Sequence, residues 1–347
     1  MDLALLEALS NADSVAAHEQ EVRDIIKDEL ADYRDSFQYD GLGSLIVTKK
    51  ATVENAPTIM FAAHMDEVGF LIRYISDIGI GYLQPLGSVE DRAKHSEIVR
   101  ATTADGRKVE GIINSLTDDH GNVTDTYVDF GFNSREEFLA AGLGVGDVVV
   151  FASTFRKLAA GAVVAGKAMD DRSGCFSLIQ AMQALKDIPC AVNVVAAFTS
   201  SEEVGTRGGR LTAKIVNPDV FFAVDVAKNP ELDRGFKNTR KIGHGPMLEY
   251  YDRMMVPNPK LLQFVAETAE NANLNYQKDM FKGGGTDAGT AHLENAGHAA
   301  AVLGLPLRYC HNPYSFADTK DLSTLAQLIQ VLSQSFSQQT IEQIYQF

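Results

Sequence analysis

The pattern of apolar and polar positions changes twice along the chain, from helices and buried strands to short strands and back. In residues 1–67, two stretches with apolar residues at helical spacing precede the run "APTIMFAAH", which ends at His64. A continuous apolar run of this kind is typical of a central strand that is covered on both faces. Before it, the turn signal Asp40–Gly41 separates two strand-like runs and predicts a hairpin or a tight strand connection.

The middle of the chain consists of short strand-like pieces separated by turn signals. The pieces are "VGFLIRYI", "IGYLQPL", "SEIVRATT", "KVEGIINSL", "DTYVDFGF" and "GDVVVFAST". Within this region only "SREEFLAAGL" has the spacing of a helix. Residues 68–157 are therefore predicted to form a small β-rich module.

From residue 158 onward, helices and apolar strands alternate again. The stretches "SGCFSLIQAMQALKDI", "NPKLLQFVAETAENAN" and "LSTLAQLIQVLSQSFSQQTIEQI" are predicted helices, the last a single closing helix. The stretches "AVNVVAAFTS", "DVFFAVDV" and "AAAVLGLP" are predicted buried strands. This alternation indicates an α/β domain with a largely parallel sheet covered on both faces. We predict one discontinuous domain, residues 1–67 and 158–347, interrupted by the β-rich module.

Composition and charge exclude some classes of partner. The net charge of −15 argues against nucleic acid and anionic membranes, because both bind basic surfaces. No run approaches the roughly 18 apolar residues of a membrane helix. The N-terminal stretch lacks the basic start and long apolar centre of a signal peptide. The three cysteines, Cys175, Cys190 and Cys310, show no C-x-x-C spacing and fit free thiols. We therefore expect a cytoplasmic protein.

Side chains that can bind metal ions gather where the predicted strands end. The residues are His64 and Asp66 after one strand, Glu202 and Glu203 after the next, Asp225 within another, His311 after the last, and Asp170 with Asp171 at the start of a helix. In an open α/β sheet, ligands bind beyond the carboxyl ends of the strands. These groups are therefore expected to converge at one edge of the sheet.

Two imidazoles and several carboxylates, without a thiol pair, suit zinc, cobalt or manganese. A single catalytic zinc needs about three protein ligands. The larger set here favours two ions that share a carboxylate, as in sites where two metals lie roughly 3.5–4 Å apart. Glu202 and Glu203 then fit two different roles, since one can bind a metal while the other stays free as a general base.

Each of these features also has an ordinary structural explanation when it is taken alone. Adjacent glutamates are common in polar loops, and paired aspartates at a helix start commonly cap the helix. The glycine-rich stretch "KGGGTDAG" lacks the P-loop pattern, and its glycines instead allow close approach of backbone to a ligand. By default, six histidines are assigned to the surface or the core: His18, His95, His120, His244, His292 and His298.

Six motifs give the chain a family resemblance. In this order, "HMDEVGF", "GKAMDDRSGC", "TSSEEVGTRGG", "VDV", "GGGTDAG" and "RYCHNP" resemble the glutamyl and tetrahedral (TET-type) aminopeptidases, which are dinuclear metallopeptidases. The resemblance covers essentially the whole chain. It implies a zinc-exopeptidase-like mixed sheet covered by helices, with the β-rich module as a PDZ-like domain that mediates assembly. Dimers that build to dodecamers are implied as well.

The resemblance also implies roles for the site residues. His64, Asp170 and Asp225 would hold one metal, and Glu203 and His311 the other, with Asp170 bridging. Glu202 would be the general base, and Asp66 would orient His64. The motif "RYCHNP" departs from the family, because Cys310 and Asn312 stand where relatives often carry an aliphatic residue and serine. This departure affects the substrate pocket rather than the metal ligands.

The implied activity is the removal of N-terminal amino acids from peptides that have a free N-terminus. Lys228, Lys282 and Lys320 lie near the motifs and are candidates for selecting acidic residues, although lysines are usually found at the surface. Two alternatives remain, a related dinuclear deacylase or carboxypeptidase and a non-catalytic metal-binding scaffold. A free base beside a metal ligand argues against the scaffold, because binding alone does not require one.

Overall fold

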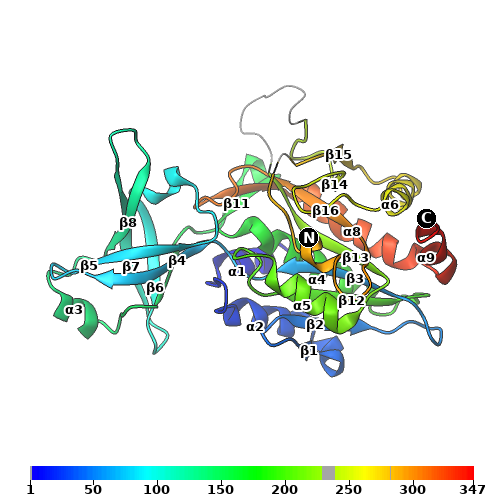
Figure 1. The fold of residues 1–347 in the computed structure, drawn as a ribbon, viewed down its shortest axis with the longest axis horizontal. Helices are drawn as coiled ribbons and strands as arrows, with labels where there is room; N and C mark the ends of the chain where they lie inside the picture. The colour runs from blue at the N-terminus through cyan, green and yellow to red at the C-terminus, as the bar shows by residue number, and fades with distance from the viewer. Residues whose placement is uncertain (1, 229–238, 282) are drawn as a thin grey trace.

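The computed structural model describes residues 2–228, 239–281 and 283–347, and its larger part is built on an eight-stranded mixed sheet (Figure 1). Along the sheet the strands are β1 (Gln38–Tyr39), β2 (Leu45–Lys49), β12 (Asn193–Thr199), β3 (Thr58–His64), β13 (Val220–Lys228), β16 (Ala299–Leu307), β14 (Met247–Glu249) and β15 (Gln277–Asp279). The four central strands, β12, β3, β13 and β16, are parallel. On either side, β2 and β14 run antiparallel to their neighbours in this group. The predicted mixed α/β fold is confirmed.

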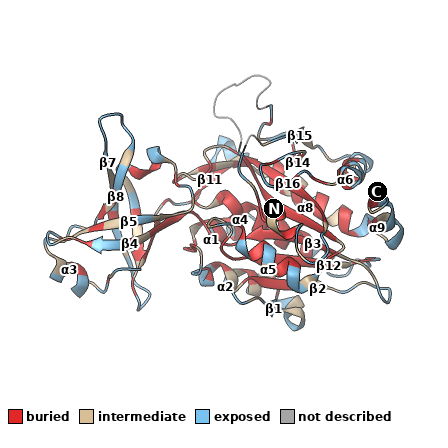
Figure 2. Ribbon diagram, in the orientation of Figure 1, coloured by how far each residue is buried: buried red, intermediate tan, exposed pale blue. Residues whose placement is uncertain are grey.

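The central strands are coloured as buried over most of their length in Figure 2. Their alternating side chains face two separate cores. On one face, Phe61 stacks on Phe222 with ring centroids 4.9 Å apart. Residues of α1 (Leu3–Asn11), α2 (Gln20–Glu29), α4 (Met169–Leu185), α6 (Pro259–Asn271), α8 (Thr319–Ser335) and α9 (Gln338–Ile344) share this core. On the other face, Met60 and Ala62 pack with α5 (Arg207–Val216) and α7 (Ala288–Ala291). The continuous apolar runs of the sequence thus correspond to strands buried on both faces.

A closed barrel extends from one side of the sheet (Figure 1). Its strands are β4 (Gly69–Ile75), β5 (Ile80–Leu86), β8 (Val123–Asp129), β7 (Lys108–Thr117), β6 (Glu97–Thr102) and β9 (Val148–Phe151), in this order around the barrel. The short elements η2 (Asp91–Lys94) and α3 (Arg135–Ala140) lie between its strands. The barrel has its own apolar core, which includes Phe70, Phe138 and Phe151. The exact domain boundaries at residues 67 and 157 stay a prediction.

A three-stranded sheet joins two segments that are distant in sequence. Strands β10 (Arg156–Leu158) and β17 (Ser315–Asp318) each pair antiparallel with β11 (Val163–Gly166). Strand β11 leads into α4, and β17 follows the "RYCHNP" motif. This sheet, which the sequence did not predict, therefore brings the start of α4 close to His311. Two further 3-10 turns, η1 (Ala31–Ser36) and η3 (Ala159–Gly161), complete the elements among the described residues.

The predicted single closing helix is wrong, because the chain forms two helices there. Helix α8 ends at Ser335, and Phe336 has an extended backbone with ψ of 143°. The Phe336 ring packs against Phe222 and Phe264, and the Ser337 hydroxyl then caps α9 by accepting from the N–H of Thr340. Burial of one aromatic ring thus interrupts an otherwise helical pattern. Among the described residues, the helices lack the length and apolar character of a membrane span.

Candidate metal centre

The four central parallel strands end at one edge of the sheet, and the predicted site residues meet there. His64 is the last residue of β3, Asp225 lies near the end of β13, and the Glu202–Glu203 pair follows β12. His311 comes shortly after β16, and Asp170 belongs to the first turn of α4. All six side chains line one cavity of about 500 Å³. The convergence expected from strand order is therefore present in the structure.

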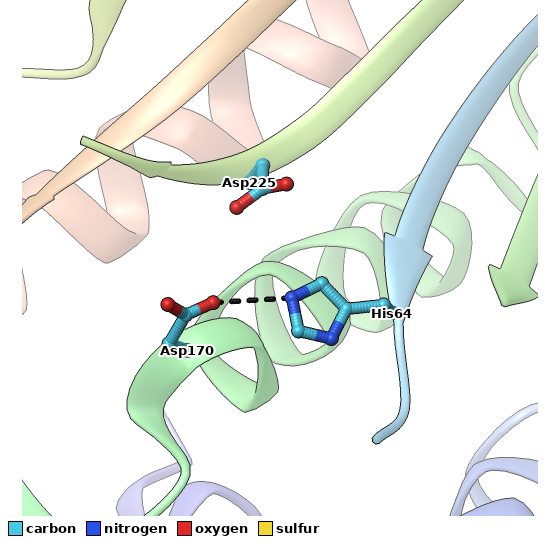
Figure 3. A group of neighbouring side chains, drawn as sticks. All are labelled: His64, Asp170 and Asp225. Atoms are coloured by element: carbon cyan, nitrogen blue, oxygen red, sulfur yellow. Dashed lines mark hydrogen bonds and ion pairs between the residues drawn. The ribbon is translucent and has the colours of Figure 1, made fainter. Parts of the chain in front are cut away.

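One group of ligand atoms is formed by His64, Asp170 and Asp225 (Figure 3). The Nε2 atom of His64 lies 3.1 Å from Oδ1 of Asp170. The Asp225 carboxylate, carried by the neighbouring strand, points into the same space, and its Oδ1 accepts from the N–H of Val226 at 2.6 Å. Three nitrogen and oxygen ligands from three separate elements thus come within 4.8 Å of one another.

The second group is formed by Asp170, Glu203 and His311. The Nε2 atom of His311 lies 3.2 Å from Oδ2 of Asp170 and 3.5 Å from Oε1 of Glu203. Asp170 therefore turns one carboxylate oxygen toward each histidine. This is the arrangement that a carboxylate shared between two ions requires.

Backbone carbonyl groups orient both histidine rings. The Nδ1 atom of His64 lies 2.9 Å from the carbonyl oxygen of Asp66, and Nδ1 of His311 lies 2.9 Å from that of Ser88. Each ring therefore turns Nε2 toward the carboxylates, as a ligating imidazole does when its other nitrogen donates to a carbonyl. Ser88 belongs to the barrel loop after β5, so both parts of the fold contribute to the site.

Asp66 contacts both the imidazole of His64 and the loop that carries the two glutamates. Its carboxylate is 3.6 Å from Nδ1 of His64, so the carbonyl oxygen makes the closer contact. The two carboxylate oxygens instead accept from the backbone N–H groups of Glu202, at 2.9 Å, and Glu203, at 3.1 Å. Asp66 thus holds both the imidazole and the loop that carries the two glutamates.

The electrostatics of the centre reflect an excess of buried carboxylates. Burial raises the pKa of Glu203 to about 8 and that of Asp225 to about 7, and Asp170 adds to both shifts. Burial also raises the pKa of Glu202 well above its usual range. Burial opposes protonation of His311, but Glu203 and Asp170 outweigh it and raise the pKa of this imidazole to about 9. Without added cations, the centre therefore holds protons that exposed groups would release.

The residues present fit two divalent cations. Within the described part of the chain, the buried oxygen Oε1 of Glu203 has no hydrogen-bond partner. Such an atom is costly to bury unless a cation or a donor reaches it. The available ligands are imidazole nitrogens and carboxylate oxygens, which suit zinc, cobalt and manganese.

Asp171 faces away from both groups of ligands. Its Oδ1 accepts from the N–H of Gly174 at 3.0 Å, and its Oδ2 accepts from the backbone N–H of His64 at 3.2 Å. Asp170 and Asp171 both have non-helical backbone angles, and the peptide bond between them is cis. Of the two aspartates, Asp171 caps the helix through its bond to Gly174, and Asp170 lies in the metal centre.

Two functional candidates near the cavity were missed by sequence reasoning. Asp287, in the glycine-rich motif, is 3% exposed, and its Oδ2 accepts from the hydroxyl of Thr199 at 2.6 Å. A Cβ at Gly209 would lie 2.4 Å from the Asp287 side chain, so a glycine is needed there for close packing. Arg240 lines the cavity, but no strand end or motif marked it. In the sequence, Asp287 could have been noticed as an acidic residue within the glycine-rich motif.

The other sequence candidates are placed less centrally. Lys228 lines the cavity and forms an ion pair with Glu90 of the barrel loop, and Cys310 also lines it. Lys320 is exposed at the start of α8 and does not line the cavity, whereas Lys282 lies outside the described residues. The six remaining histidines belong to neither ligand group among the residues that the structure describes.

A second group of buried charges, which we call the ion network, lies next to the centre. It consists of Asp13, Glu67, Arg100, Lys167 and Arg172. The Lys167 ammonium lies 2.6 Å from Oε1 of Glu67 and 3.2 Å from Oδ1 of Asp13. Arg172 is fully buried and donates to the carbonyl oxygens of Met65 and Leu9. Arg100, from strand β6 of the barrel, donates to both carboxylate oxygens of Asp13.

Comparison with known proteins agrees with this fold. The family model for M42 glutamyl aminopeptidases matches residues 43–328. A glutamyl aminopeptidase of Lactococcus lactis is 30% identical, over 98% of both chains. The crystal structure of a TET aminopeptidase from a marine sediment archaeon of the Thaumarchaeota is 34% identical, with a TM-score of 0.94 over 99% of both chains. The TET1 peptidase of Pyrococcus horikoshii, which can assemble into a tetrahedron or a large octahedral shell, is 29% identical, with a TM-score of 0.87 over 96% of this chain and 99% of that one.

Proposed function

Because the chain belongs to the M42 glutamyl aminopeptidase family, we propose that it removes N-terminal amino acids from peptides with the help of two divalent metal ions. The observation that carries this proposal is the pair of ligand groups that share Asp170. His64 and Asp225 complete one group, and Glu203 and His311 the other. A dinuclear deacylase or carboxypeptidase would use similar ligands, and the family match favours the aminopeptidase.

The proposed ligands divide the work between two positions. His64, Asp170 and Asp225 would hold one ion, and Asp170, Glu203 and His311 the other. When bound, such ions polarise the scissile carbonyl, lower the pKa of a water molecule and attract the free α-amine of the peptide. Zinc and cobalt are the proposed ions, with manganese as a third candidate, because the ligand set combines imidazoles and carboxylates.

Glu202 is the proposed general base. Its carboxylate lines the cavity beside the ligand Glu203, and its backbone is fixed by Asp66. In this position it can accept a proton from the attacking water and pass it to the amine that leaves. The adjacent glutamates then have separate tasks, since Glu203 turns toward His311 and Glu202 stays available for the proton.

Substitutions of Glu202 and Glu203 test whether one is the base and the other a metal ligand. Glu202→Gln should lower kcat by about 10²–10⁴-fold, as for loss of a general base, while metal content measured by elemental analysis stays at the wild-type value. Glu203→Ala should instead lower the metal content. Glu54→Gln, at an exposed loop residue, serves as the control that changes neither quantity. Retained turnover in Glu202→Gln, or full metal occupancy in Glu203→Ala, would contradict the assignment.

The substrate class has its own test. The assay uses an aminoacyl-p-nitroanilide with a free amine and its N-acetylated form, together with zinc, cobalt or manganese. An aminopeptidase releases p-nitroaniline only from the free-amine substrate. A deacylase instead releases acetate from the acetylated substrate. Absence of cleavage with metal bound would support the scaffold alternative instead.

We further propose that the cavity prefers an acidic N-terminal side chain, and Arg240 supports this preference. Its guanidinium donates to the carbonyl oxygens of Lys228 and Met280 and to Asp279, and it lies over the ring of Phe281 at 5.0 Å. Among the described residues, its second terminal nitrogen has no hydrogen-bond acceptor. A guanidinium fixed in this way and lining the cavity matches a substrate carboxylate.

Arg240→Gln tests the preference through the ratio of kcat/KM values for an acidic and an apolar substrate. The variant should lower kcat/KM for glutamyl-p-nitroanilide by about tenfold or more relative to leucyl-p-nitroanilide, because a charge-assisted hydrogen bond contributes about 1.5–3 kcal/mol. An unchanged ratio between the two substrates would assign specificity to another part of the cavity.

A homo-oligomer is the proposed form of the protein. The support is the similarity over most of the chain to the Pyrococcus horikoshii TET1 peptidase, which forms shells. Light scattering on the purified protein would measure the assembly directly. A monomeric mass at micromolar concentration would contradict this part of the proposal.

A further inference from the structure

Glu19 is a buried carboxylate that holds the loop carrying the two catalytic-site glutamates. It directly precedes α2 and is 2% exposed. Its Oε1 accepts from the hydroxyl of Ser200 at 2.5 Å, from the backbone N–H of Ser201 at 3.2 Å and from that of Ala17 at 3.0 Å. The guanidinium of Arg23 lies 3.6 Å from the other oxygen, Oε2. Glu19 therefore directs one buried oxygen at residues 200 and 201.

The loop after β12 is held by side chains from other segments rather than by sheet hydrogen bonds. The N–H of Ser200 donates to the hydroxyl of Ser44 at 3.0 Å, and the N–H of Ser201 donates to Glu19. The next two N–H groups, those of Glu202 and Glu203, donate to the carboxylate of Asp66. Four consecutive amides are thus fixed by three residues that are distant in sequence.

The backbone of this loop is also constrained by its own conformation and by α5. Ser201 has φ of +61°, in the left-handed region that non-glycine residues rarely adopt. A Cβ at position 208 would lie 2.5 Å and 2.6 Å from the backbone oxygen and nitrogen of Ser200, so Gly208 allows α5 to pack directly on the loop. Glu19 contacts the loop through side-chain and backbone groups at this unusual position.

From this geometry we propose that Glu19 is a positioning residue for the base Glu202. This inference rests on the proposed function, because it assigns Glu19 to the same reaction. Glu19 touches no reacting atom, and it acts by fixing Ser200 and Ser201, directly before Glu202. A displacement of about 1 Å at a reacting group can lower the rate about 10²-fold, so a residue that fixes the base has a large effect on turnover.

A buried carboxylate at this position is explained by its three hydrogen-bond donors. All three donors reach the same oxygen, Oε1, which the length of the side chain carries to the loop after β12. An acceptor oxygen at this place thus suits a clamp on a strained loop.

The first test is kinetic. Glu19→Ala should lower kcat of the metal-loaded enzyme by about 10²-fold, with KM and metal content within about twofold of wild type. Glu19→Gln keeps an acceptor oxygen and should recover most of the lost turnover. Asp28→Ala removes an exposed carboxylate from the same helix and serves as the matched control. A parallel loss of kcat and metal content would overturn the proposal in favour of a general structural role.

The second test does not depend on activity. In metal-free protein, amide hydrogen exchange of the peptide covering residues 199–203 should be at least about tenfold faster in Glu19→Ala than in wild type. Peptides from the barrel should exchange at unchanged rates. Equal exchange of the 199–203 peptide in both proteins would overturn the proposal.

A double variant separates positioning of the base from other effects. Glu202→Asp shortens the base and already misplaces its carboxylate. Adding Glu19→Ala to this variant should lower kcat by much less than it does in wild type, because both changes act on the same group. Fully multiplicative losses would overturn the proposal. If wild-type protein cleaved no free-amine substrate, the proposed function would fail instead, while the exchange result would still report on the clamp.

Discussion

Two buried groups of charged side chains lie side by side in this molecule, and their balance of acids and bases differs. In the ion network, the carboxylates of Asp13 and Glu67 are paired with Lys167, Arg100 and Arg172. In the metal centre, the carboxylates of Asp170, Glu203 and Asp225 lie beside the imidazoles of His64 and His311. The difference shows in single residues. Lys167 and Arg100 overcome the effect of burial and lower the pKa of Asp13, whereas burial raises the pKa of Asp225 to about 7.

The contrast teaches how to distinguish a structural group of charges from a ligand site. The network is neutralised by the protein's own cations and satisfies its oxygens within the chain. In the metal centre, burial raises the pKa values of Glu203 and Asp225, and one buried oxygen, Oε1 of Glu203, has no hydrogen-bond partner in the described residues. Converging buried acids with raised pKa values and an oxygen without a hydrogen-bond partner therefore suit an external cation.

The two groups share short segments of chain. In the segment after β3, His64 and Asp66 contribute to the metal centre and Glu67 to the network. At the start of α4, Asp170 faces the centre, while Lys167 and Arg172 on either side of it face the network. The network therefore fixes the backbone from which the ligands project.

The largest expected effect comes from breaking the network. Lys167→Met leaves Glu67 and Asp13 with less compensation in a buried place and should lower the free energy of unfolding by about 3–5 kcal/mol. Lys186→Met removes a solvent-screened surface ion pair with Asp32 and should change the free energy of unfolding far less. Chemical denaturation measures both values. Equal stability of the two variants would remove the distinction between the network and an ordinary surface pair.

An intermediate effect on stability is expected from the metal centre. Here the substitution should stabilise the metal-free protein rather than destabilise it. Without metal, Asp225 binds a proton in the folded state up to about pH 7, whereas its ordinary pKa is 3.8. Its contribution to stability is therefore full below about pH 4 and is lost as the pH rises to about 7. Asp225→Asn removes this dependence, so in chelator at pH 8 the variant should unfold at a higher temperature than wild type.

Added metal should make wild type more stable than Asp225→Asn. An ion at 100 times its Kd stabilises the folded protein by about 2.7 kcal/mol, and wild type should gain more than the variant that lacks a ligand. Melting curves from pH 5 to 8, with chelator and with zinc, measure both effects. If wild type and Asp225→Asn had parallel pH curves in chelator, the raised pKa of Asp225 would be refuted.

The smallest effect on stability is expected from the barrel loop that contacts the metal centre. Gly87 has φ of +76°, and a Cβ there would lie 2.8 Å from Val68 and 3.2 Å from Oε2 of Glu203. Gly87→Ala should cost about 1–2 kcal/mol of stability and weaken metal binding about tenfold, since it shifts the carbonyl of Ser88 that orients His311. Gly106→Ala, at a similar φ of +82° with open space around it, should share only the stability cost. Calorimetric titration with zinc compares the two variants, and equal affinities would contradict a role for the loop in the centre.

Much of the metal centre could be predicted from the sequence because its residues stand at the ends of strands. Strand identity follows from apolar runs, and parallel strands bring their carboxyl ends together without further information. His64 and Asp225 were found in this way. The division of the glutamate pair into a metal ligand and a base was argued from their chemistry, and the family resemblance assigned each role to one residue. Both steps remain a proposal.

The ion network and the Glu19 clamp could not be predicted, because no spacing relates their members. Lys167 and Glu67 are 100 positions apart, and Glu19 and Ser200 are 181 apart. Their contacts depend on how loops pack after the sheet has formed. The break between α8 and α9 was missed for a similar reason, since Phe336 leaves the helix to pack against rings that are distant in sequence.

The position of β16 in the sheet has a consequence for the growing polypeptide. This strand lies between β13 and β14, although both precede it in the sequence, and only the residues after it supply His311. Synthesis proceeds from the N-terminus at about 5–20 residues per second, so His64, Asp170, Glu203 and Asp225 all leave the ribosome before the strand that completes the sheet. The second group of ligands is therefore complete only after His311 has been synthesised, so the proposed metal ion at that position would be captured late in the maturation of the nascent chain.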